Sequence, residues 1–389
     1  MKLSVIIAVY NEAHLLAKAL WSLKHQSVAP DELILTDDGS DEDILAAIQP
    51  IIQGFHYPVK FISQPHRGFR LARCRNNGAR HATGDYFIFL DQDIVLSRNF
   101  LEICVKHRRP RQFCVAYPVR LTGQQSQLVT EVVIERSDFR DIVTKAQVHK
   151  VKRQYFKDNF YRLLKRLHLR RIGPKLRGFF SAINRDDFIL VNGYDENYQG
   201  WGNEDDDLGH RLYAAGIHGK NPFYTVYPLH LFHPPYHQNG ERVNQGYYAR
   251  RQKAIDRGEF RCQLGFEQPR DDENLTVLDE AASQYILMRM VPCRCLMKII
   301  KSVDQSANAS PKRSIISGRS LGIIKHGRGC IKIDILASLP LNRPLHQFDV
   351  ISVPLFRGDV FGDAGAMGAP GTNDLGESRK FSDLQQLGI

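Results

Sequence analysis

The first hundred residues alternate between continuous apolar runs and segments whose apolar positions have helical spacing. The apolar runs predict strands at residues 3–10, 32–38, 59–63 and 87–95. The helical spacing predicts helices at residues 12–25, at 41–53 and over about a dozen residues that end near Gly84. Strands that alternate with helices of this length are typical of right-handed βαβ units. The pattern therefore predicts an α/β fold with a Rossmann-like, mostly parallel central sheet flanked by helices.

Polar residues gather where three of these strands end, at Tyr10 to Glu12, Asp37 to Asp41 and Asp91 to Asp93. Ligands of parallel sheets bind at the carboxyl ends of the strands, so we expect the three clusters to converge on one crevice. There, the ring of Tyr10 could cover a flat base, and Asp38 could accept a hydrogen bond from the ring NH of that base. The helix N-termini that follow the strands are expected to help to hold phosphates, and Ser40 or Asp41 is expected to cap the second helix.

The segment FIFLDQDIV joins a buried strand to two carboxylates, Asp91 and Asp93. Two hard oxygen ligands at the rim of a sheet suit a divalent cation that carries phosphates. The alternative is a strand followed by an acidic turn, because Asp is common where strands stop.

The segment before this strand carries four arginines: Arg67, Arg70, Arg73 and Arg75. Arginines three apart on a helix share a face, and one that turns inwards could pair with a diphosphate or with Asp91. The alternative is a row of solvated charges.

Beyond residue 96 the pattern is clear only in parts, and residues 97–150 are mixed. The later elements that it predicts are a strand at FFSAI, helices at 185–191 and 204–215, and a strand near 223–227. Four consecutive acids, Glu204 to Asp207, begin the second helix. The helix dipole accounts for some of them. It does not account for the preceding Gly-Trp-Gly, which is expected to place a flat side chain beside the acids on a flexible hinge.

Residues 155–171 form a basic amphipathic stretch. Its apolar residues are Phe156, Phe160, Leu163, Leu164 and Leu167, with Lys157, Arg162, Lys165, Arg166, Arg170 and Arg171 around them. Such a helix could lie on an anionic membrane surface. The alternative is an ordinary helix that packs its apolar stripe on the domain.

Composition narrows the class of protein. With 43% hydrophobic and 24% charged residues, the chain of 389 residues is typical of soluble globular proteins. Its net charge of +11 favours phosphate-rich partners, an anionic membrane surface or nucleic acid. Nucleic acid is not expected, because the aromatic residues are not interleaved with the basic stretches as base stacking requires.

The seven scattered cysteines and the lack of a long apolar run bear on location. The cysteines have no C-x-x-C spacing, which argues against a disulfide framework or a zinc site and fits a reducing cytosol. No run reaches the roughly 18 apolar residues of a membrane-spanning helix. We therefore expect a cytoplasmic protein, peripheral at the inner face of the membrane if residues 155–171 bind lipid.

Four segments, in this order, carry a family resemblance: VIIAVYNE, TDDGSDED, ARCRNNGARHATGDYFIFLDQD and GYDENYQGWGNEDDDLGHRL. Together they resemble an inverting family 2 glycosyltransferase of the GT-A fold. The GWGNEDDD segment is similar to the corresponding segments of β1,4-galactosyltransferases and bacterial chondroitin polymerases. The resemblance covers residues 1 to about 240.

The resemblance implies which residues bind the nucleotide sugar. These residues are Tyr10, Glu12, Asp38, Arg73, Asn77, Asp91 and Trp201. Asp38 matches the carboxylate that recognises uracil, and Tyr10 lies where the base is sandwiched. Arg73 and Asn77 fall in the block that contacts the sugar-phosphate region. Trp201 matches the residue beside the donor and acceptor sugars.

The resemblance also implies a metal site. Asp91-Gln92-Asp93 matches the metal-binding D-x-D, in which the last Asp usually ligates Mn²⁺ that bridges the nucleotide diphosphate. Galactosyltransferases have a further ligand pair spaced Met-x-x-His, and the aligned spacing here is His230 to His233. The predicted ligands are therefore Asp91, Asp93 and His233, with His230 as the rival third ligand. Mixed oxygen and nitrogen ligation suits Mn²⁺, and Mg²⁺ is the alternative.

Glu204 and Asp205 match the acidic pair from which the family's general base is drawn. The resemblance therefore implies a metal-dependent inverting glycosyltransferase that moves a sugar from a UDP-sugar to a hydroxyl of a glycan or lipid-linked glycan acceptor, in assembly of a cell-surface polysaccharide or lipopolysaccharide. One alternative is a nucleotidyltransferase that acts on sugar phosphates. It would need a Gly-rich loop after the first strand, and VYNEAHLL supplies none. The other is a basic nucleic-acid-binding protein.

The expected organisation is a GT-A domain at 1–260, followed by an extension and a tail. Within the domain, 1–96 would bind the nucleotide and 97–260 would carry the acceptor and catalytic residues. Residues 261–320 are expected to be mostly helical or irregular, with a helix at 281–301. Residues 321–389 are rich in Gly, Asp and Ser towards the end and are expected to be irregular and partly disordered.

Overall fold

A computed structural model describes residues 1–234, 243–270, 274–279, 288–289, 323–326 and 329–332. The chain divides into two units, Met1–Val303 and Asp304–Ile389. In the second unit, β13 (Ile323–His326) and β14 (Gly329–Lys332) pair as an antiparallel hairpin. Of the helix expected at 281–301, the structure describes residues 288–289, which form the short strand β12; the rest of that helix and the end of the chain, expected to be partly disordered, lie outside the described residues.

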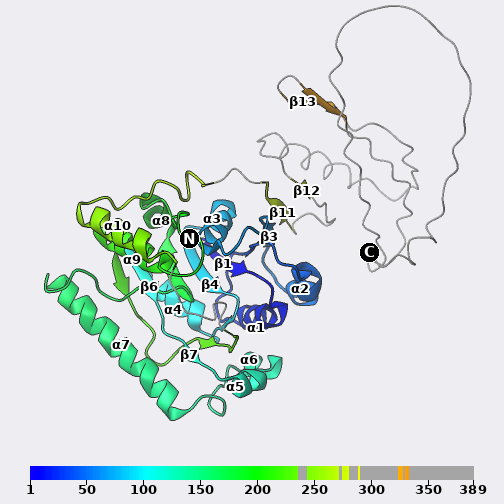
Figure 1. Ribbon diagram of the computed structural model, residues 1–389. Coiled ribbons are helices and arrows are strands. Elements are labelled where there is room, and N and C mark those ends of the chain that lie inside the picture. The colour runs from blue at the N-terminus through cyan, green and yellow to red at the C-terminus, as the bar shows by residue number, and fades with distance from the viewer. Residues whose placement is uncertain (235–242, 271–273, 280–287, 290–322, 327–328, 333–389) are drawn as a thin grey trace, which may run out of the picture. The chain divides into compact units, whose positions relative to one another are not determined.

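The described part of the first unit is built on a nine-stranded sheet in the order β12-β11-β3-β2-β1-β4-β8-β6-β9 (Figure 1). The strands are β1 (Leu3–Val9), β2 (Glu32–Asp37), β3 (Val59–Ser63), β4 (Tyr86–Asp91), β6 (Gln112–Val115), β8 (Phe180–Asn184), β9 (His218–Lys220), β11 (Thr276–Asp279) and β12 (Met288–Arg289). The neighbours β3, β2, β1 and β4 are parallel. Strand β8 runs against both β4 and β6, so β6 and its parallel neighbour β9 point the same way as β4. The predicted α/β fold with a mostly parallel sheet is confirmed.

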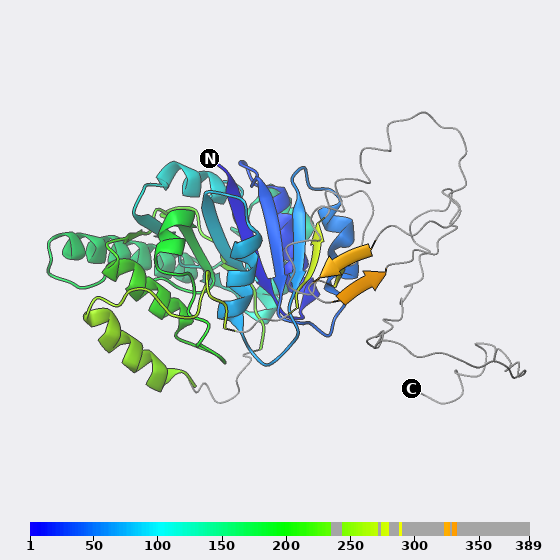
Figure 2. The ribbon, with the colours of Figure 1, turned by 90° about the horizontal axis from the view of Figure 1, so that it is seen from above.

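Helices lie on both sides of the strands (Figures 1 and 2). They are α1 (Ala13–Lys24), α2 (Ile44–Ile52), α3 (Leu71–His81), α4 (Phe100–His107), α5 (Gly123–Leu128), α6 (Glu131–Arg136), α7 (Lys145–Arg166), α8 (Arg185–Leu190), α9 (Glu204–Ala214) and α10 (Gln245–Asp256). None of the helices in the described residues combines the length and apolar character that crossing a bilayer requires.

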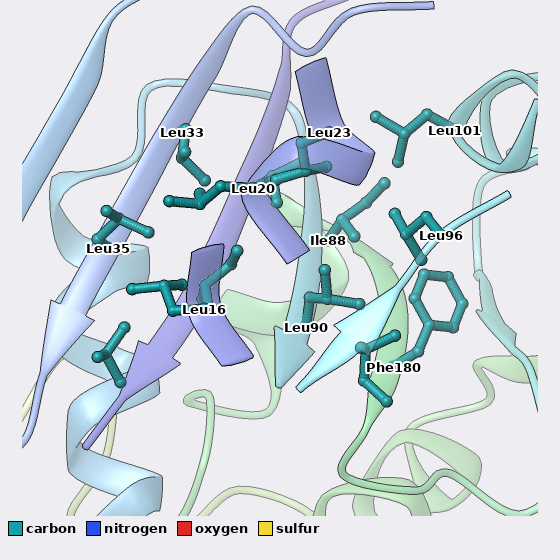
Figure 3. Packing of buried hydrophobic residues seen from close by; sticks show 14 of the residues in the cluster. Leu16, Leu20, Leu23, Leu33, Leu35, Ile88, Leu90, Leu96, Leu101 and Phe180 are labelled. Atoms are coloured by element: carbon teal, nitrogen blue, oxygen red, sulfur yellow. The ribbon is translucent and has the colours of Figure 1, made fainter. Parts of the chain in front are cut away.

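The central strands are apolar on both faces because each face is covered. Along β1, Val5 and Ile7 belong to one buried cluster, whereas Ile6 belongs to another on the opposite face. In the first cluster, α1 packs on the sheet through Leu16, Leu20 and Leu23 (Figure 3). The second contains residues from α3, α8 and α9, including Phe188 and Leu208. The helices packed on the two faces of the sheet hold the central strands in place, and with them the edge at which the parallel strands end.

The predicted strand at 87–95 is interrupted at its two carboxylates. Strand β4 ends at Asp91, and a separate short strand, β5 (Ile94–Val95), follows. Strand β5 belongs to a smaller sheet with β7 (Val119–Arg120) and β10 (Leu229–His230). The interruption turns Asp93 away from the large sheet, so the D-x-D lies where the two sheets meet.

Three further expectations about elements were wrong. No strand forms at 223–227, and the chain there uses β9 and β10 instead. The basic stretch predicted at 155–171 is part of α7, which starts earlier and stops at Arg166. Helix α2 begins after Asp43, whose side chain accepts a hydrogen bond from the Ala46 amide at 3.0 Å, so neither Ser40 nor Asp41 caps it. Between residues 112 and 136 the elements have two to six residues each, which is too short for a sequence period.

Candidate active site

A cleft of about 760 Å³ opens at the carboxyl ends of β1, β2 and β4. Its lining includes residues that the sequence analysis singled out: Tyr10, Glu12, Asp38, Arg75, Asp91, Asp93, Trp201, Glu204, Asp205, Asp206, His230 and His233. The three polar clusters at the strand ends therefore do converge. The acids of α9 join them, because α9 begins at the same cleft.

Asp93, His230 and His233 form a potential metal-binding cluster. Backbone pairing aligns β10 with β5, with His230 opposite Ile94, and the Leu231 amide donates to the Asp93 carbonyl oxygen at 3.0 Å. The Nε2 atoms of His230 and His233 lie 3.2 and 3.1 Å from Oδ2 of Asp93. One ligand atom from each residue fits within 4.8 Å of the others. The short β5–β10 pairing thus brings three ligands together from distant parts of the chain.

Both imidazoles are oriented for ligation through Nε2. Nδ1 of His230 lies 2.9 Å from the carbonyl oxygen of Leu231, and Nδ1 of His233 lies 2.9 Å from that of Pro234. An Nδ1–H donated to a carbonyl leaves the Nε2 lone pair directed at the cluster. The hydrogen bond with Asp93 raises the pKa of His233 to about 9, so a cation, whether a proton or a metal, is favoured there. One carboxylate and two imidazoles fit Mn²⁺.

Asp91, the other predicted ligand, is held by an arginine. Arg75 is 1% exposed, and its Nη2 donates to Oδ1 of Asp91 at 2.7 Å. Its Nη1 donates to Oδ1 of Asp205 at 2.8 Å, and Nη2 also donates to the Gly178 carbonyl oxygen at 2.9 Å. A Cβ at Gly178 would come within 2.5 Å of Oδ2 of Asp205, so a glycine is needed at this approach. Arg75 is the inward-turned arginine that the sequence predicted, and it links the end of β4 to the start of α9.

The four acids of α9 divide into two pairs. Asp206 forms an ion pair with Lys175 at 2.6 Å, and the fully buried Asp207 pairs with Arg211 at 2.6 Å. Glu204 and Asp205 line the cleft, where Asp205 is paired with Arg75, and Asp206 also borders the cleft. The helix dipole and these ion pairs account for Asp206 and Asp207. Glu204 and Asp205 lie where a reaction could use their carboxyl groups.

Burial raises the pKa of both cleft-facing acids. For Glu204, repulsion from Asp205 adds to the effect of burial; for Asp205, the charge of Arg75 partly offsets it. Oε2 of Glu204 is buried and has no hydrogen-bond partner within the described residues. A carboxylate pair with raised pKa values in a cleft is a candidate for general base chemistry.

Trp201 stands at the rim of the cleft on a loop held in place by Asn244. The side chain of Trp201 is 39% exposed, and its neighbours Gly200 and Gly202 have φ values of 77° and 102°. The Asn244 amide donates to the carbonyl oxygens of Gly200 and Gly202 at 3.2 and 3.1 Å. The glycines therefore supply backbone angles for a pinned turn, where the sequence suggested a flexible hinge.

The predicted base-binding residues lie together at the ends of β1 and β2. Asp38 is buried and accepts hydrogen bonds from the Arg70 amide at 2.9 Å and from Gln64. The ring of Tyr10 stacks on His66 with centroids 4.7 Å apart. Gln92, between the two D-x-D acids, bonds to the Tyr10 amide at 2.8 Å and to the Tyr10 carbonyl at 3.1 Å. These bonds tie the aromatic residue to the D-x-D segment.

The N-terminus of α1 does not have the role expected of it. Glu42 accepts hydrogen bonds from the amides of Glu12 and Ala13 at 3.0 and 2.9 Å. Because a carboxylate already occupies these amides, they are not available to a phosphate. This arrangement also leaves no phosphate-gripping loop after β1, as a nucleotidyltransferase would need.

Arg73 and Asn77 lie outside the lining of the cleft. Both are buried on α3, where Nη1 of Arg73 is 3.5 Å from Glu196 and the Asn77 amide donates to Gln64 at 2.7 Å. Their predicted contact with the sugar-phosphate region stays a prediction. Arg75 lies two residues beyond Arg73, and the spacing of the arginines alone does not distinguish them.

Residues 4–184 match the model for glycosyl transferase family 2, and residues 158–234 match that for the N-terminal domain of galactosyltransferase. Residues 4–184 are a family 2 glycosyltransferase domain. The predicted family resemblance and its GT-A fold class are confirmed, and the domain is that of a glycosyltransferase.

Individual relatives have modest identity. The chain is 29% identical over 231 residues to validoxylamine A glucosyltransferase of Streptomyces hygroscopicus subsp. limoneus, covering 55% of this chain and 48% of the relative. It is 28% identical over 240 residues to chondroitin synthase of Escherichia coli, covering 56% and 33%. A mannosyltransferase of Pyrobaculum calidifontis, solved with GDP-Man and Mn²⁺, is similar with a TM-score of 0.42 and 18% identity, covering 66% and 62%. The chain spans about half the length of the first of these relatives.

Proposed function

We propose that the chain is a metal-dependent inverting glycosyltransferase that moves a sugar from a UDP-sugar to a hydroxyl of a glycan acceptor. The acceptor would belong to a cell-surface polysaccharide or lipopolysaccharide, free or lipid-linked. One observation carries the proposal: a single cleft holds the Asp93–His230–His233 cluster and the Glu204–Asp205 pair. The names of the relatives, a glucosyltransferase and a chondroitin synthase, support transfer of a sugar.

One group of cleft residues would bind the UDP leaving group, and another would act on the acceptor hydroxyl that attacks the sugar. Asp93, His230 and His233 would hold Mn²⁺ or Mg²⁺, which neutralises charge on the departing diphosphate when bound. Tyr10 and Asp38 would bind the uracil, by stacking and by accepting its ring NH. Both sets of residues lie at the strand ends, so the donor would lie along this edge of the sheet.

On the attacking side, Asp205 is the proposed general base. The acceptor oxygen forms a bond to the anomeric carbon as the bond from that carbon to the diphosphate oxygen breaks, and the hydroxyl proton passes to the carboxylate. Inversion follows because the hydroxyl attacks from the face opposite the leaving group. Trp201 would offer its ring to the sugars. Glu204 is the rival base because one of its oxygens has no partner in the described residues.

Metal-dependent nucleotide binding tests the proposal. UDP with Mn²⁺ is expected to raise the melting temperature, because a ligand at about 100 times its Kd stabilises the native state by about 2.7 kcal/mol. His233→Ala removes one ligand and should lose most of this shift, whereas UDP without metal should give little shift in either protein. A thermal-shift panel of nucleotide sugars, with and without Mn²⁺, measures both effects and identifies the donor.

The matched control is His149→Ala, which removes an exposed imidazole of α7 outside the cleft. It should respond like the unmodified protein. Failure of the unmodified protein to bind UDP or any UDP-sugar in the presence of Mn²⁺ would overturn the proposed function.

The proposal extends to contact with an anionic membrane through α7. Four apolar side chains in or just after this helix, Phe156, Phe160, Leu163 and Leu167, are each at least 50% exposed, although Phe156 has an edge contact with the ring of Tyr224. They recur at i, i+4, i+7 and i+11, so they share one face.

The opposite face of α7 holds the helix on the domain. Val151 and Asp158 are buried there, and Asp158 accepts a hydrogen bond from the Asn221 amide at 2.8 Å. An exposed apolar stripe flanked by lysines and arginines is complementary to an anionic bilayer surface. The exposure of this stripe supports the membrane-facing interpretation of the helix.

Vesicle binding tests this contact. The double variant F156S/F160S is expected to bind phosphatidylglycerol vesicles at least about tenfold more weakly in a co-sedimentation assay, because two aromatic side chains no longer enter the interface. The control L128S/V132S removes two exposed apolar side chains from α5 and α6, and it should bind as the unmodified protein does. Equal losses in the two variants would argue against a specific role of α7.

A further inference from the structure

A second cavity lies at the opposite edge of the sheet from the proposed active site. Its volume is about 400 Å³. It includes Gln112 and His218, the first residues of the parallel strands β6 and β9, which run in the same direction as β4. The cleft is at the carboxyl ends of the parallel strands, whereas this cavity is at the amino ends of β6 and β9. It therefore does not belong to the donor site.

The cavity, called here the basic pocket, is lined by cations from three parts of the chain. Its lining residues with basic side chains are Arg109, Arg111, Arg162, Lys165, Arg166, His218 and Lys220. No Asp or Glu is among its lining residues. Residues before β6, the last turns of α7 and strand β9 thus direct positive charge at one volume.

Acidic partners for these cations are nearly lacking in the described part of the chain. Arg111 lies 3.7 Å from Asp187, and that is the one ion pair to a carboxylate that the described residues give the pocket. Arg162 instead donates to Gln112 at 3.4 Å, and Nζ of Lys220 lies 2.9 Å from Nδ1 of His107. Arg109 and Arg111 also donate to the carbonyl oxygens of Arg108 and Ala215. Within the described residues, the positive charges of the pocket are therefore held near one another with one carboxylate to compensate them.

Burial and, after it, the neighbouring positive charges lower the pKa values of three of these groups. Burial, followed by the charge of Arg166, lowers the pKa of Arg162. Burial, followed by the charge of Arg162, lowers the pKa of Lys220. The pKa of His218 is lowered in the same way, by burial and by Lys165. An anion in the pocket would relieve this mutual repulsion.

We propose that the basic pocket binds a phosphate group with more than one negative charge, of the phosphomonoester or diphosphate class. Several guanidinium groups around one volume favour phosphate, because their planar forks match phosphate oxygens in pairs. Lys165 and Lys220 add point charges. The volume accommodates a diphosphate or a lipid headgroup but not a whole glycan. Such a group could come from a phosphorylated soluble molecule or from an anionic lipid.

Titration with inorganic pyrophosphate in the presence of EDTA tests the pocket. The metal-free condition separates it from the cleft, where the proposed diphosphate binding needs a cation. The full-length protein is expected to bind pyrophosphate by calorimetry, with affinity that falls as salt rises. The variant K165E/R166E should bind at least about tenfold more weakly, because two attractive charges become repulsive.

The matched control is R153E/K157E, which makes the same charge change on α7 away from the pocket. It should bind pyrophosphate within about threefold of the unmodified protein, since distant exposed charges are screened. Similar melting temperatures for the two variants verify folding. Absence of pyrophosphate binding by the unmodified protein, or equal losses in both variants, would overturn the proposal. Neither result bears on Mn²⁺-dependent UDP binding, so the proposed function is tested separately.

Vesicles distinguish the two sources of the phosphate. If the ligand is a lipid headgroup, phosphatidic acid vesicles should bind the unmodified protein more strongly than phosphatidylcholine vesicles, K165E/R166E should lose this preference and pyrophosphate should compete. If K165E/R166E loses pyrophosphate but keeps the preference for phosphatidic acid, the pocket takes a soluble phosphate group and the α7 surface recognises the membrane. Both results support the pocket as a phosphate site.

Discussion

Replacing Asp205 by Asn is expected to abolish sugar transfer while UDP binding stays nearly unchanged. The amide keeps the size of the side chain but cannot take the acceptor proton, and loss of a general base typically lowers the rate by about 10²- to 10⁴-fold. The substituted side chain would keep an amide oxygen for Arg75 to contact, so the cleft should keep its shape. The measurements are transfer to a glycan acceptor and UDP binding with Mn²⁺ on the same preparation.

Glu204→Gln provides the comparison for this experiment. If Asp205 is the base, the Gln variant should retain more activity than the Asn variant. In the unmodified protein, activity should fall as pH decreases through the pKa of the base, which burial raises above that of an ordinary Asp. Full activity of Asp205→Asn together with an inactive Glu204→Gln would transfer the role to Glu204.

Of the variants proposed here, Arg75→Met should show the largest decrease in the free energy of unfolding. It leaves Asp91 and Asp205 close to each other without the cation between them, and breaking a buried ion pair in this way typically costs about 3–5 kcal/mol. The lower value is expected, because the side chains of Asp91 and Asp205 are 31% and 17% exposed and water can partly solvate them. Chemical denaturation measures the difference.

The loss should depend on pH with a defined sign. Burial raises the pKa of Asp205, and the charge of Arg75 partly offsets this effect. Without Arg75 the pKa of Asp205 in the folded state should rise further, so this carboxyl destabilises the folded state once it ionises. The deficit should therefore be larger at pH 8 than at pH 5. Arg140→Met is the control, because Arg140 and its partner Asp138 are exposed and the pair should contribute little. A pH-independent deficit would indicate lost packing instead of lost charge compensation.

Much of the fold could be predicted because its determinants are local. Apolar runs such as Leu3–Val9 and the leucine spacing in α1 identify the elements, and parallel order places Tyr10, Asp38 and Asp91 at one edge. The direction of β8 could not be predicted, because the apolar pattern of FFSAI is compatible with either a parallel or an antiparallel strand. Strands as short as β5 and β10 have no recognisable period of apolar residues, so their pairing could not be predicted from the sequence either.

The limits for the site have the same origin. The sequence set His230 and His233 against each other as rivals, because only the three-dimensional pairing of β10 with β5 shows that both reach Asp93. It grouped Arg73 with Arg75 on one helix without showing which of them turns towards Asp91. It did identify α7 as amphipathic. Which face meets the domain depends on tertiary contacts such as that between Asp158 and Asn221.

The pairing of β5 with β10 makes the proposed cation a thermodynamic link between the two parts of the chain. One ligand, Asp93, follows β4, whereas His230 lies in β10 and His233 just after it, so a bound ion would act as a removable cross-link. By reciprocity, any change that loosens β10 must weaken ion binding by the same factor by which the ion tightens β10. Metal affinity would therefore report how well residues 229–233 are docked, even for changes that touch none of the three ligands.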